Sequence, residues 1–288
     1  MREKQTMTYT AGIDVGSTYT KAVIMRDDQI AGRGLINTGF KLAEATTRAL
    51  QLALDQAGLK QDDLAYIATT GYGRFQVPFR DLNITDLTAS AAGARYFFPN
   101  TQTILDVGGQ TMKASRLQED GRVKSFRLND KCAAGTGAFL EKTARYMGYS
   151  TIEIGPLAAT SKEVIAISGV CAVFAESEVI NHLSQGSSPA DIMYGSIVSL
   201  VDRSVQLMKR VQMEPEFTLI GGILRYESMA KIIREKLGVD VNVPEGELVQ
   251  FTTALGAALL ARRRLNKLSE QGAVIDRGQA VLADPVAD

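Results

Sequence analysis

The sequence predicts an α/β protein built from two related halves. The stretch TQTILDVGGQTMK, Thr101 to Lys113, repeats the pattern of AGIDVGSTYTK, Ala11 to Lys21. Aligning Asp14 with Asp106 also matches the Val, Gly, Lys and Ala residues that follow each aspartate. Each copy has the order strand, carboxylate, glycine turn, strand, and helical segments follow both copies. We therefore expect an internal duplication in which sheets and helices alternate.

Length and composition are typical of a globular protein with more than one domain. The chain has 288 residues, 45% of them hydrophobic, which is enough to fill two cores. Lys plus Arg (32) balances Asp plus Glu (32), so no large basic surface for nucleic acid is expected. The first ten residues are polar, and no uncharged apolar run reaches membrane-spanning length. We expect a cytoplasmic protein with neither a membrane nor a nucleic acid as partner.

Periodicity predicts the elements of the first half. Residues 9–15 and 20–25 form a hairpin that turns at Gly16 and Ser17, and residues 30–37 add a third strand. Residues 42–57 place their Leu and Ala residues on one helical face, and Gly58 ends that helix. A strand at 66–70 then leads into Gly71-Tyr72-Gly73-Arg74, before a helix at about 86–96.

The second half begins with a hairpin at 103–117 and a strand at 124–128. Helices are predicted at 138–147, from 169–171 to about 183, from Pro189 to about 211, at 228–237 and at 252–265, with short strands at 163–168, 217–220 and 239–243. Ser188 and Pro189 are the N-cap and first residue of the longest of these helices. Beyond Ser269 the periodicity fades, and we expect a loose tail.

The duplicated pattern is suited to phosphate and metal binding. An apolar strand delivers an aspartate at its end, and glycines let backbone N–H groups approach an anion closely. One carboxylate from each copy can hold a hydrated Mg²⁺, which prefers one or two carboxylates together with water and phosphate oxygens. The alternative is that both copies are ordinary hairpins with Asp-x-Gly turns. Repetition with Asp, Gly and Lys in register favours the phosphate interpretation.

These motifs and their order resemble the actin, hexokinase and heat-shock-chaperone ATPase superfamily. GIDVGSTYTK is similar to its first phosphate loop, LDVGGQTMK to its second, and LIGGILR to its adenosine loop, while TTGYGR and TTALGAALL resemble the connecting segments. The resemblance implies two ribonuclease H-like domains with an ATP cleft between them. We assign residues 1–102 plus 252–268 to the first domain, 103–251 to the second, and 269–288 to the tail.

The resemblance also implies site roles. Asp14 and Asp106 hold Mg²⁺ through water, and Gln110 orients the attacking water. The residues expected to contact ATP are Gly16, Ser17, Thr18, Gly108 and Gly109 at the phosphates, Gly221 and Gly222 near the adenosine, Arg225 on the adenine, and Lys21 and Lys113 as further phosphate candidates.

Within that superfamily, the chain most resembles a group of iron-sulfur ATPases. They activate 2-hydroxyacyl-CoA dehydratases or serve as ATPase subunits of benzoyl-CoA reductases, and KCAAGTGAFLE and GVCAVFAESEVI carry the resemblance. Two departures stand out. Thr111 follows Gln110 where these activators usually have an acidic residue, and Thr88-Ala89-Ser90-Ala91 replaces a pair that usually contains histidine. The only histidine, His182, lies elsewhere.

The number of cysteines links iron-sulfur cluster binding to oligomerisation. A four-iron cluster usually takes four thiolates, whereas this chain has only Cys132 and Cys171. If both bind a 4Fe-4S cluster, a second chain supplies the other two ligands, so we expect a homodimer or a paralogous heterodimer. Both cysteines precede predicted helices, whose free N–H groups stabilise thiolates. The alternative is two buried thiols that act as small apolar residues.

Together these features predict an ATP-hydrolysing iron-sulfur subunit that drives a low-potential electron into an acyl-CoA-reducing partner. A ferredoxin-type donor is expected. The two departures favour the benzoyl-CoA reductase type, with activation of a 2-hydroxyacyl-CoA dehydratase as the alternative. Two other classes remain open. A small-molecule kinase would share the phosphate loops, and an actin-like assembly or chaperone module would give the cysteines no role.

Overall fold

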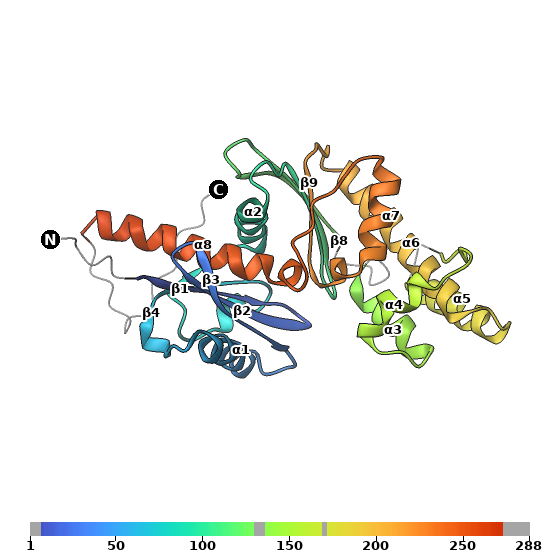
Figure 1. The fold of residues 1–288 in the computed structure, drawn as a ribbon, viewed down its shortest axis with the longest axis horizontal. Coiled ribbons are helices and arrows are strands. Elements are labelled where there is room, and N and C mark those ends of the chain that lie inside the picture. The colour runs from blue at the N-terminus through green and yellow to red at the C-terminus, as the bar shows by residue number, and fades with distance from the viewer. Residues whose placement is uncertain (1–6, 130–135, 169–171, 273–288) are drawn as a thin grey trace. The chain divides into compact units, whose positions relative to one another are not determined.

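The computed structural model describes residues 7–129, 136–168 and 172–272, and these residues form two compact units (Figure 1). Unit 1 contains the chain up to Tyr96 and again from Thr253 onward, whereas unit 2 runs from Phe97 to Thr252. Each unit has its own mixed β-sheet and its own helices. No helix among the described residues is both long enough and apolar enough to cross a membrane.

Unit 1 is built on a five-stranded sheet with the order β3-β2-β1-β4-β5. The strands are β1 (Tyr9–Val15), β2 (Tyr19–Arg26), β3 (Gln29–Asn37), β4 (Leu64–Thr70) and β5 (Leu82–Asn83). The first three pair antiparallel, and β4 pairs parallel with β1. The helices are α1 (Leu42–Ala57), α2 (Asp86–Phe97) and the larger part of α8 (Leu248–Glu270), and short 3-10 turns lie at Gln61–Asp63 and Arg74–Gln76.

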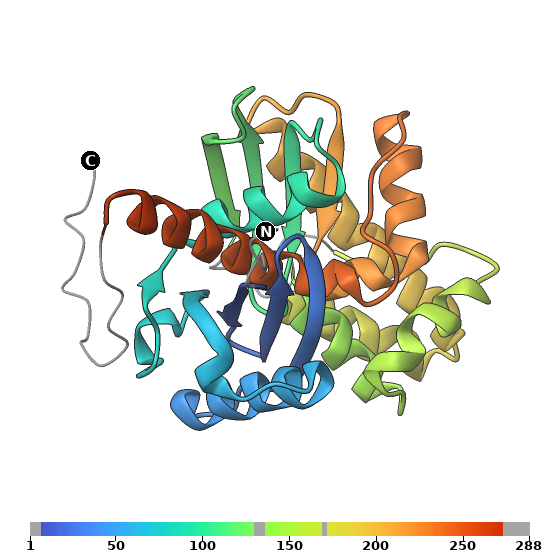
Figure 2. The ribbon, with the colours of Figure 1, turned by 60° about the vertical axis from the view of Figure 1, so that its left-hand side comes forward.

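Glycines let two helices approach opposite faces of this sheet. A Cβ atom at Gly34 would lie 2.0 Å from the carbonyl oxygen of Ala49 in α1. A Cβ atom at Gly12 would lie 2.1 Å from the carbonyl oxygen of Ala254 in α8. Because side chains alternate between the faces of a strand, these glycines open different faces. Figure 2 shows α1 and α8 on the two sides of the sheet.

Unit 2 has a four-stranded sheet with the order β8-β7-β6-β9. Its strands are β6 (Thr103–Val107), β7 (Met112–Leu117), β8 (Val123–Asn129) and β9 (Phe217–Ile220). Its helices are α3 (Gly137–Tyr146), α4 (Ile154–Ala159), α5 (Ala172–Ser184), α6 (Pro189–Lys209) and α7 (Glu227–Leu237), and 3-10 turns lie at Thr151–Glu153 and Gly222–Arg225. The core is centred on α6, whose Ile197, Leu200 and Val201 are fully buried.

The two sheets share one topology over four strands. In each, the third, second, first and fourth strands lie side by side, and the fourth runs parallel to the first. The duplication predicted from the hairpins therefore extends to β3 with β8 and β4 with β9. The described connections differ: α1 joins β3 to β4, whereas α3, α4, α5 and α6 lie between β8 and β9.

Two predicted strands are wrong. Residues 163–168 form a loop, because the neighbouring amides of Lys162 and Glu163 donate hydrogen bonds to the carboxylate of Asp191. Residues 239–243 make only one parallel bridge, between Asn242 and Thr218, before Pro244. Helix α8 begins at Leu248, earlier than expected, and α4 was not predicted. Of the predicted tail, 269–288, Ser269 and Glu270 belong to α8, and residues 273–288 lie outside the described residues.

Candidate functional site

The first half-site lies at the end of the unit 1 hairpin. Asp14 is the next-to-last residue of β1, and the antiparallel register places Lys21 of β2 opposite it. Lys21 Nζ lies 3.2 Å from Asp14 Oδ2, and the side chains are 16% and 13% exposed. The carboxylate is thus held beside a cation but remains open to solvent on one side. We name Asp14, Lys21, the turn 16–18 and Gly71 the first half-site.

The turn of this half-site requires its glycine. The Gly16 amide donates to the carbonyl oxygen of Tyr19 over 3.2 Å, and a Cβ atom at Gly16 would lie 2.7 Å from that oxygen. The Thr38 hydroxyl donates to the Gly16 carbonyl oxygen over 2.7 Å. Ser17 is exposed and Thr18 is half-buried. The structure therefore places all three predicted phosphate-loop residues in one fixed turn beside Asp14.

Gly71, which was not among the predicted site residues, also contacts Asp14. It directly follows β4 and has φ +86°, a conformation that favours glycine. A Cβ atom there would lie 2.5 Å from Asp14 Oδ1 and 2.7 Å from the Val15 carbonyl oxygen. Gly71 thus leaves room for the carboxylate. The sequence signal was present, because a glycine pair follows a strand at Gly71-Tyr72-Gly73.

The second half-site repeats this geometry in unit 2. Lys113 Nζ lies 3.8 Å from Asp106 Oδ2, and the side chains are 16% and 15% exposed. Gly221 follows β9 with φ +99°. A Cβ atom on Gly221 would lie 2.8 Å from Asp106 Oδ1 and 2.4 Å from the Val107 carbonyl oxygen. The structure therefore places Gly221, predicted to lie near adenosine, directly against the second aspartate.

A helix holds the loop of the second half-site. The amides of Gly137 and Ala138, the first residues of α3, donate to the carbonyl oxygens of Gly108 and Gly109 over 3.0 and 2.7 Å. Gln110 is exposed in the same loop. We name Asp106, Lys113, loop 108–110 and Gly221 the second half-site.

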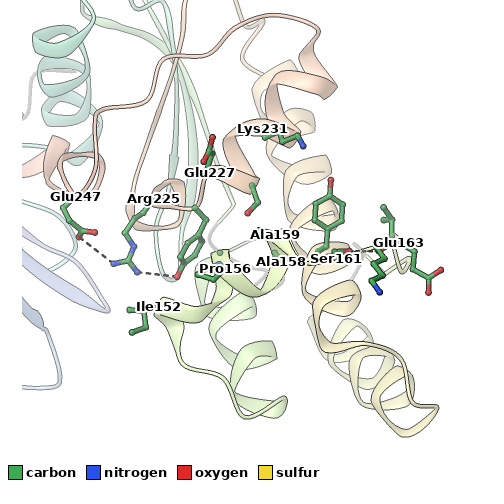
Figure 3. A pocket seen from close by; sticks show the side chains of 16 residues that line it. Ile152, Pro156, Ala158, Ala159, Ser161, Glu163, Arg225, Glu227, Lys231 and Glu247 are labelled. Atoms are coloured by element: carbon green, nitrogen blue, oxygen red, sulfur yellow. Dashed lines mark hydrogen bonds and ion pairs between the residues drawn. The ribbon is translucent and has the colours of Figure 1, made fainter.

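Arg225 lies at the edge of a large pocket within unit 2 (Figure 3). The pocket has a volume of about 930 Å³ and is lined by α4, loop 161–164, the 3-10 turn at Gly222–Arg225 and α7. Arg225 Nη1 lies 3.9 Å from Glu247 Oε2, and its Nη2 donates to Tyr226 Oη over 3.5 Å. Burial raises the pKa of nearby Glu141, although the charge of Arg225 opposes that rise.

Cys132 and Cys171 lie outside the described residues. The helices that follow them in sequence are described, and they contact each other. Lys142 of α3 lies with its Nζ 2.6 Å from Glu176 Oε2 of α5, and this hydrogen bond raises the pKa of Lys142. The chain segments that carry the two cysteines therefore lead into two helices joined by an ion pair. Within residues 7–129, 136–168 and 172–272, no group of three or more His, Cys, Asp or Glu side chains is placed to hold a metal ion.

The half-sites fit a hydrated magnesium nucleotide. Each has one partly exposed carboxylate at a strand end, a lysine that offsets its charge, and a glycine turn whose backbone can approach phosphate. Hydrated Mg²⁺ takes one or two carboxylates and fills its remaining positions with water and phosphate oxygens. This chemistry does not need a closed cage of protein ligands.

Known proteins share both the sequence and the fold of this chain. The BadF/BadG/BcrA/BcrD ATPase family matches residues 11–261. A 2-hydroxyisocaproyl-CoA dehydratase activator of Clostridioides difficile is 36% identical over 88% of this chain and 94% of its own length. The (R)-2-hydroxyglutaryl-CoA dehydratase activating ATPase of Acidaminococcus fermentans is 37% identical over 90% and 99%, and a benzoyl-CoA reductase subunit of Thauera aromatica is 35% identical over 92% and 97%.

Two of these relatives have similar solved structures. The Clostridium difficile activator with bound ADPNP superimposes with a TM-score of 0.87 over 93% of this chain and all of that chain, at 34% identity. The Acidaminococcus fermentans dehydratase component A gives a TM-score of 0.85 over 90% and 99%, at 36% identity. The predicted fold class is confirmed as the α/β actin-like ATPase fold with two sheets. The protein belongs to the BadF/BadG/BcrA/BcrD ATPase family.

Proposed function

We propose that this protein is an ATP-hydrolysing activator that drives a low-potential electron into an acyl-CoA dehydratase. The observation that carries the proposal is the paired half-site. Two units each present one carboxylate, one lysine and one crowded glycine at the end of equivalent strands. Relatives that share nearly the whole chain length are dehydratase activators.

In this proposal the two half-sites bind one MgATP. Asp14 and Asp106 hold the hydrated metal, and Gln110 orients the attacking water. The backbone of Gly16, Ser17, Thr18, Gly108 and Gly109 cradles the phosphates, although the Gly16 and Gly108 amides themselves donate within their turns, to Tyr19 and Thr111. Lys21 and Lys113 offset charge. Phosphoryl transfer depends mainly on positioning and charge stabilisation, and these residues supply both.

The unit 2 pocket is the proposed adenosine site. Its volume of about 930 Å³ is within the usual range for small-molecule sites. Gly222 and Arg225 belong to the 3-10 turn that follows the second half-site, so a nucleotide with its phosphates at Asp106 extends toward this pocket. The Arg225 side chain is 25% exposed, and its guanidinium is available to stack on a purine.

Cys132 and Cys171 are the proposed ligands of a 4Fe-4S cluster shared with a second chain. When bound, the cluster supplies one-electron chemistry at low potential. The described part of the chain offers a path for coupling. The loop of the second half-site is hydrogen-bonded to α3, and α3 is ion-paired to α5. Movement of the loop on nucleotide binding would therefore reach both cysteine-bearing segments.

The relatives described above favour a dehydratase as the partner. The sequence alone favoured benzoyl-CoA reductase, on the basis of Thr111 and the segment 88–91, and that finer assignment is not specifically confirmed. Two dehydratase activators at 36% and 37% identity stand beside one reductase subunit at 35%. A reductase partner therefore remains the second candidate, and a ferredoxin-type protein remains the proposed donor.

One anaerobic experiment tests the activity and the partner. The protein is reduced with dithionite and mixed with a 2-hydroxyacyl-CoA dehydratase or a benzoyl-CoA reductase core, in the presence of MgATP, MgADP or a non-hydrolysable analogue. We expect electron transfer to the dehydratase only with MgATP. Equal transfer without nucleotide would refute the coupling, and transfer to the reductase alone would reassign the partner.

A second measurement tests the cluster. Anaerobically purified protein is expected to contain about four irons per dimer and to absorb broadly at about 400 nm. Cys132→Ser is expected to lose iron and to weaken the dimer. A full iron complement in that variant would show that the cluster is held in another way.

A further inference from the structure

Thr70, the last residue of β4, carries a buried hydroxyl that has no partner among the described residues. The residue is fully buried, and its Oγ1 makes no hydrogen bond. The adjacent Thr69 provides a contrast, because its Oγ1 donates to the Arg74 carbonyl oxygen over 2.9 Å. An unsatisfied buried hydroxyl costs free energy, so its presence needs an explanation.

The position of Thr70 supplies that explanation. In the parallel pairing of β1 with β4, Thr70 is the register partner of Asp14. Register partners project from the same face of a sheet, so the hydroxyl lies on the side of the sheet that carries the Asp14 carboxylate. The next residue, Gly71, leaves space against Asp14 Oδ1. The unpartnered hydroxyl therefore lies on the Asp14 face of the sheet, next to the first half-site.

The second half-site shows that the fold does not require a hydroxyl there. The register partner of Asp106 is Ile220, which is fully buried and apolar. Gly221 follows Ile220 as Gly71 follows Thr70, so the two positions are topologically equivalent. A β-branched apolar side chain therefore satisfies the packing at this point of the strand. The hydroxyl of Thr70 serves something other than packing.

We propose that Thr70 is a positioning residue of the first half-site, whose hydroxyl hydrogen-bonds an oxygen brought by MgATP beside Asp14. That oxygen belongs either to a water of the metal hydration shell or to a phosphate group that ATP shares with ADP. This inference rests on the proposed function in one respect, because it takes MgATP as the ligand. It adds an asymmetry: the first half-site contacts the ligand through a side chain that the second half-site lacks.

The test compares Thr70→Val, which keeps the shape and removes the hydroxyl, with Thr70→Ser, which keeps the hydroxyl. Thermal unfolding is measured without nucleotide, and affinity for ADP is measured by calorimetry with Mg²⁺ and with EDTA. We expect Thr70→Val to raise the nucleotide-free Tm by about 2 °C, because an unsatisfied polar group is removed. We expect it to weaken MgADP binding about tenfold, and Thr70→Ser to restore most of that affinity.

Thr10→Val is the matched control. Thr10 is also buried, but its hydroxyl already donates to the Ala258 carbonyl oxygen over 3.1 Å, so its loss should lower Tm and leave MgADP affinity unchanged. If the weakening in Thr70→Val disappears in EDTA, the hydroxyl contacts metal-bound water; if it persists, the hydroxyl contacts phosphate. A lowered Tm together with unchanged affinity would overturn the inference. Failure of the wild-type protein to bind MgADP would instead overturn the proposed function.

Discussion

The two half-sites are fixed in place by different parts of the chain. In unit 1, the Thr38 hydroxyl from the end of β3 holds the Gly16 carbonyl oxygen at 2.7 Å. In unit 2, the first two amides of α3 hold the Gly108 and Gly109 carbonyl oxygens at 3.0 and 2.7 Å. The first loop is therefore anchored near its own sheet, and the second is anchored to a helix that continues into the rest of unit 2.

This difference follows from what joins the third and fourth strands. The described connection in unit 1 contains one long helix, α1, whereas the unit 2 connection contains α3, α4, α5 and α6. Both cysteines fall within the sequence of the longer connection, and helices and loops of that connection line much of the large pocket. The shared sheet positions the two half-sites, and the longer connection carries both cysteines and much of the pocket.

The largest expected effect comes from removing either carboxylate. Asp14→Asn and Asp106→Asn should each lower the ATPase kcat by about 100-fold or more, because each removes a charge that organises the metal. Steady-state phosphate release at saturating MgATP measures the effect. Asp202→Asn, which breaks a surface ion pair with Lys236, is the control and should stay near the wild-type rate. A large loss in only one of the two half-site variants would show that the half-sites are not functionally equivalent.

The crowded glycines provide the next test. Gly71→Ala and Gly221→Ala should each lower the free energy of unfolding by about 3 kcal/mol, because strain at positive φ adds to a clash with a carbonyl and a carboxylate oxygen. Gly58→Ala is the matched control. Gly58 has φ +67° but no atom within 4 Å of an added Cβ, so only the strain of about 1 kcal/mol is expected. Urea unfolding measures all three.

Equal losses at Gly58 and Gly71 would contradict the crowding argument. A loss of stability at Gly71 without one at Gly221 would show that the two half-sites are not equally crowded. Either result would be informative, because Gly71 and Gly221 both have positive φ and both lie against a carboxylate and a carbonyl oxygen.

Local sequence patterns predicted most of the strands and helices, because their hydrophobic periodicity is set within each segment. The first hairpin, α1 and β9 lie within one or two residues of their predicted ends. Patterns failed where a long-range contact decides the structure. Residues 163–168 have strand-like composition, but hydrogen bonds from Lys162 and Glu163 to Asp191 hold the start of the segment in a loop.

Part of the candidate site could be predicted from the sequence for the same reason. Asp14, Lys21, Asp106 and Lys113 were predicted as site residues because the repeated hairpin pattern is local in sequence, whereas the pairing of each aspartate with its lysine was not predicted. Thr70 and Gly71 were not assigned to the site, because the parallel pairing of β4 with β1 is what brings them beside Asp14. A single sequence carries no direct record of such a register.

The link between α3 and α5 gives a smaller, more selective prediction. Lys142→Met breaks the pair with Glu176 and should leave ATP hydrolysis near the wild-type rate while slowing electron transfer to the partner by about two- to fivefold, because an exposed ion pair contributes little. Lys236→Met, which breaks the α7 pair with Asp202, is the matched control and should change neither rate. Equal slowing in both variants would show that the α3–α5 pair has no special role in coupling.

The smallest expected effect concerns the loop that Asp191 holds at the edge of the pocket. Hydrogen bonds from the Lys162 and Glu163 amides, and then from the Ser161 hydroxyl, lower the pKa of Asp191. Since the folded pKa lies below the usual value of 3.8, this carboxylate contributes stability that is present above about pH 4 and is lost as pH falls through the lower, folded pKa. Asp191→Asn removes the titration.

The Tm of the wild-type protein and of Asp191→Asn should therefore differ by a few degrees at neutral pH and converge as pH falls below about 4. Asp55→Asn in unit 1 serves as the control, because the Asp55 side chain accepts a hydrogen bond from Gln51 on an exposed helix face. Its Tm difference should be small at every pH. Convergence below pH 4 for Asp191→Asn alone would place this acid-sensitive anchor in the longer connection of unit 2, where the proposed adenosine pocket lies. A constant Tm difference between pH 7 and pH 3 would mean that the loop is held by packing around Asp191 and that its charge contributes nothing.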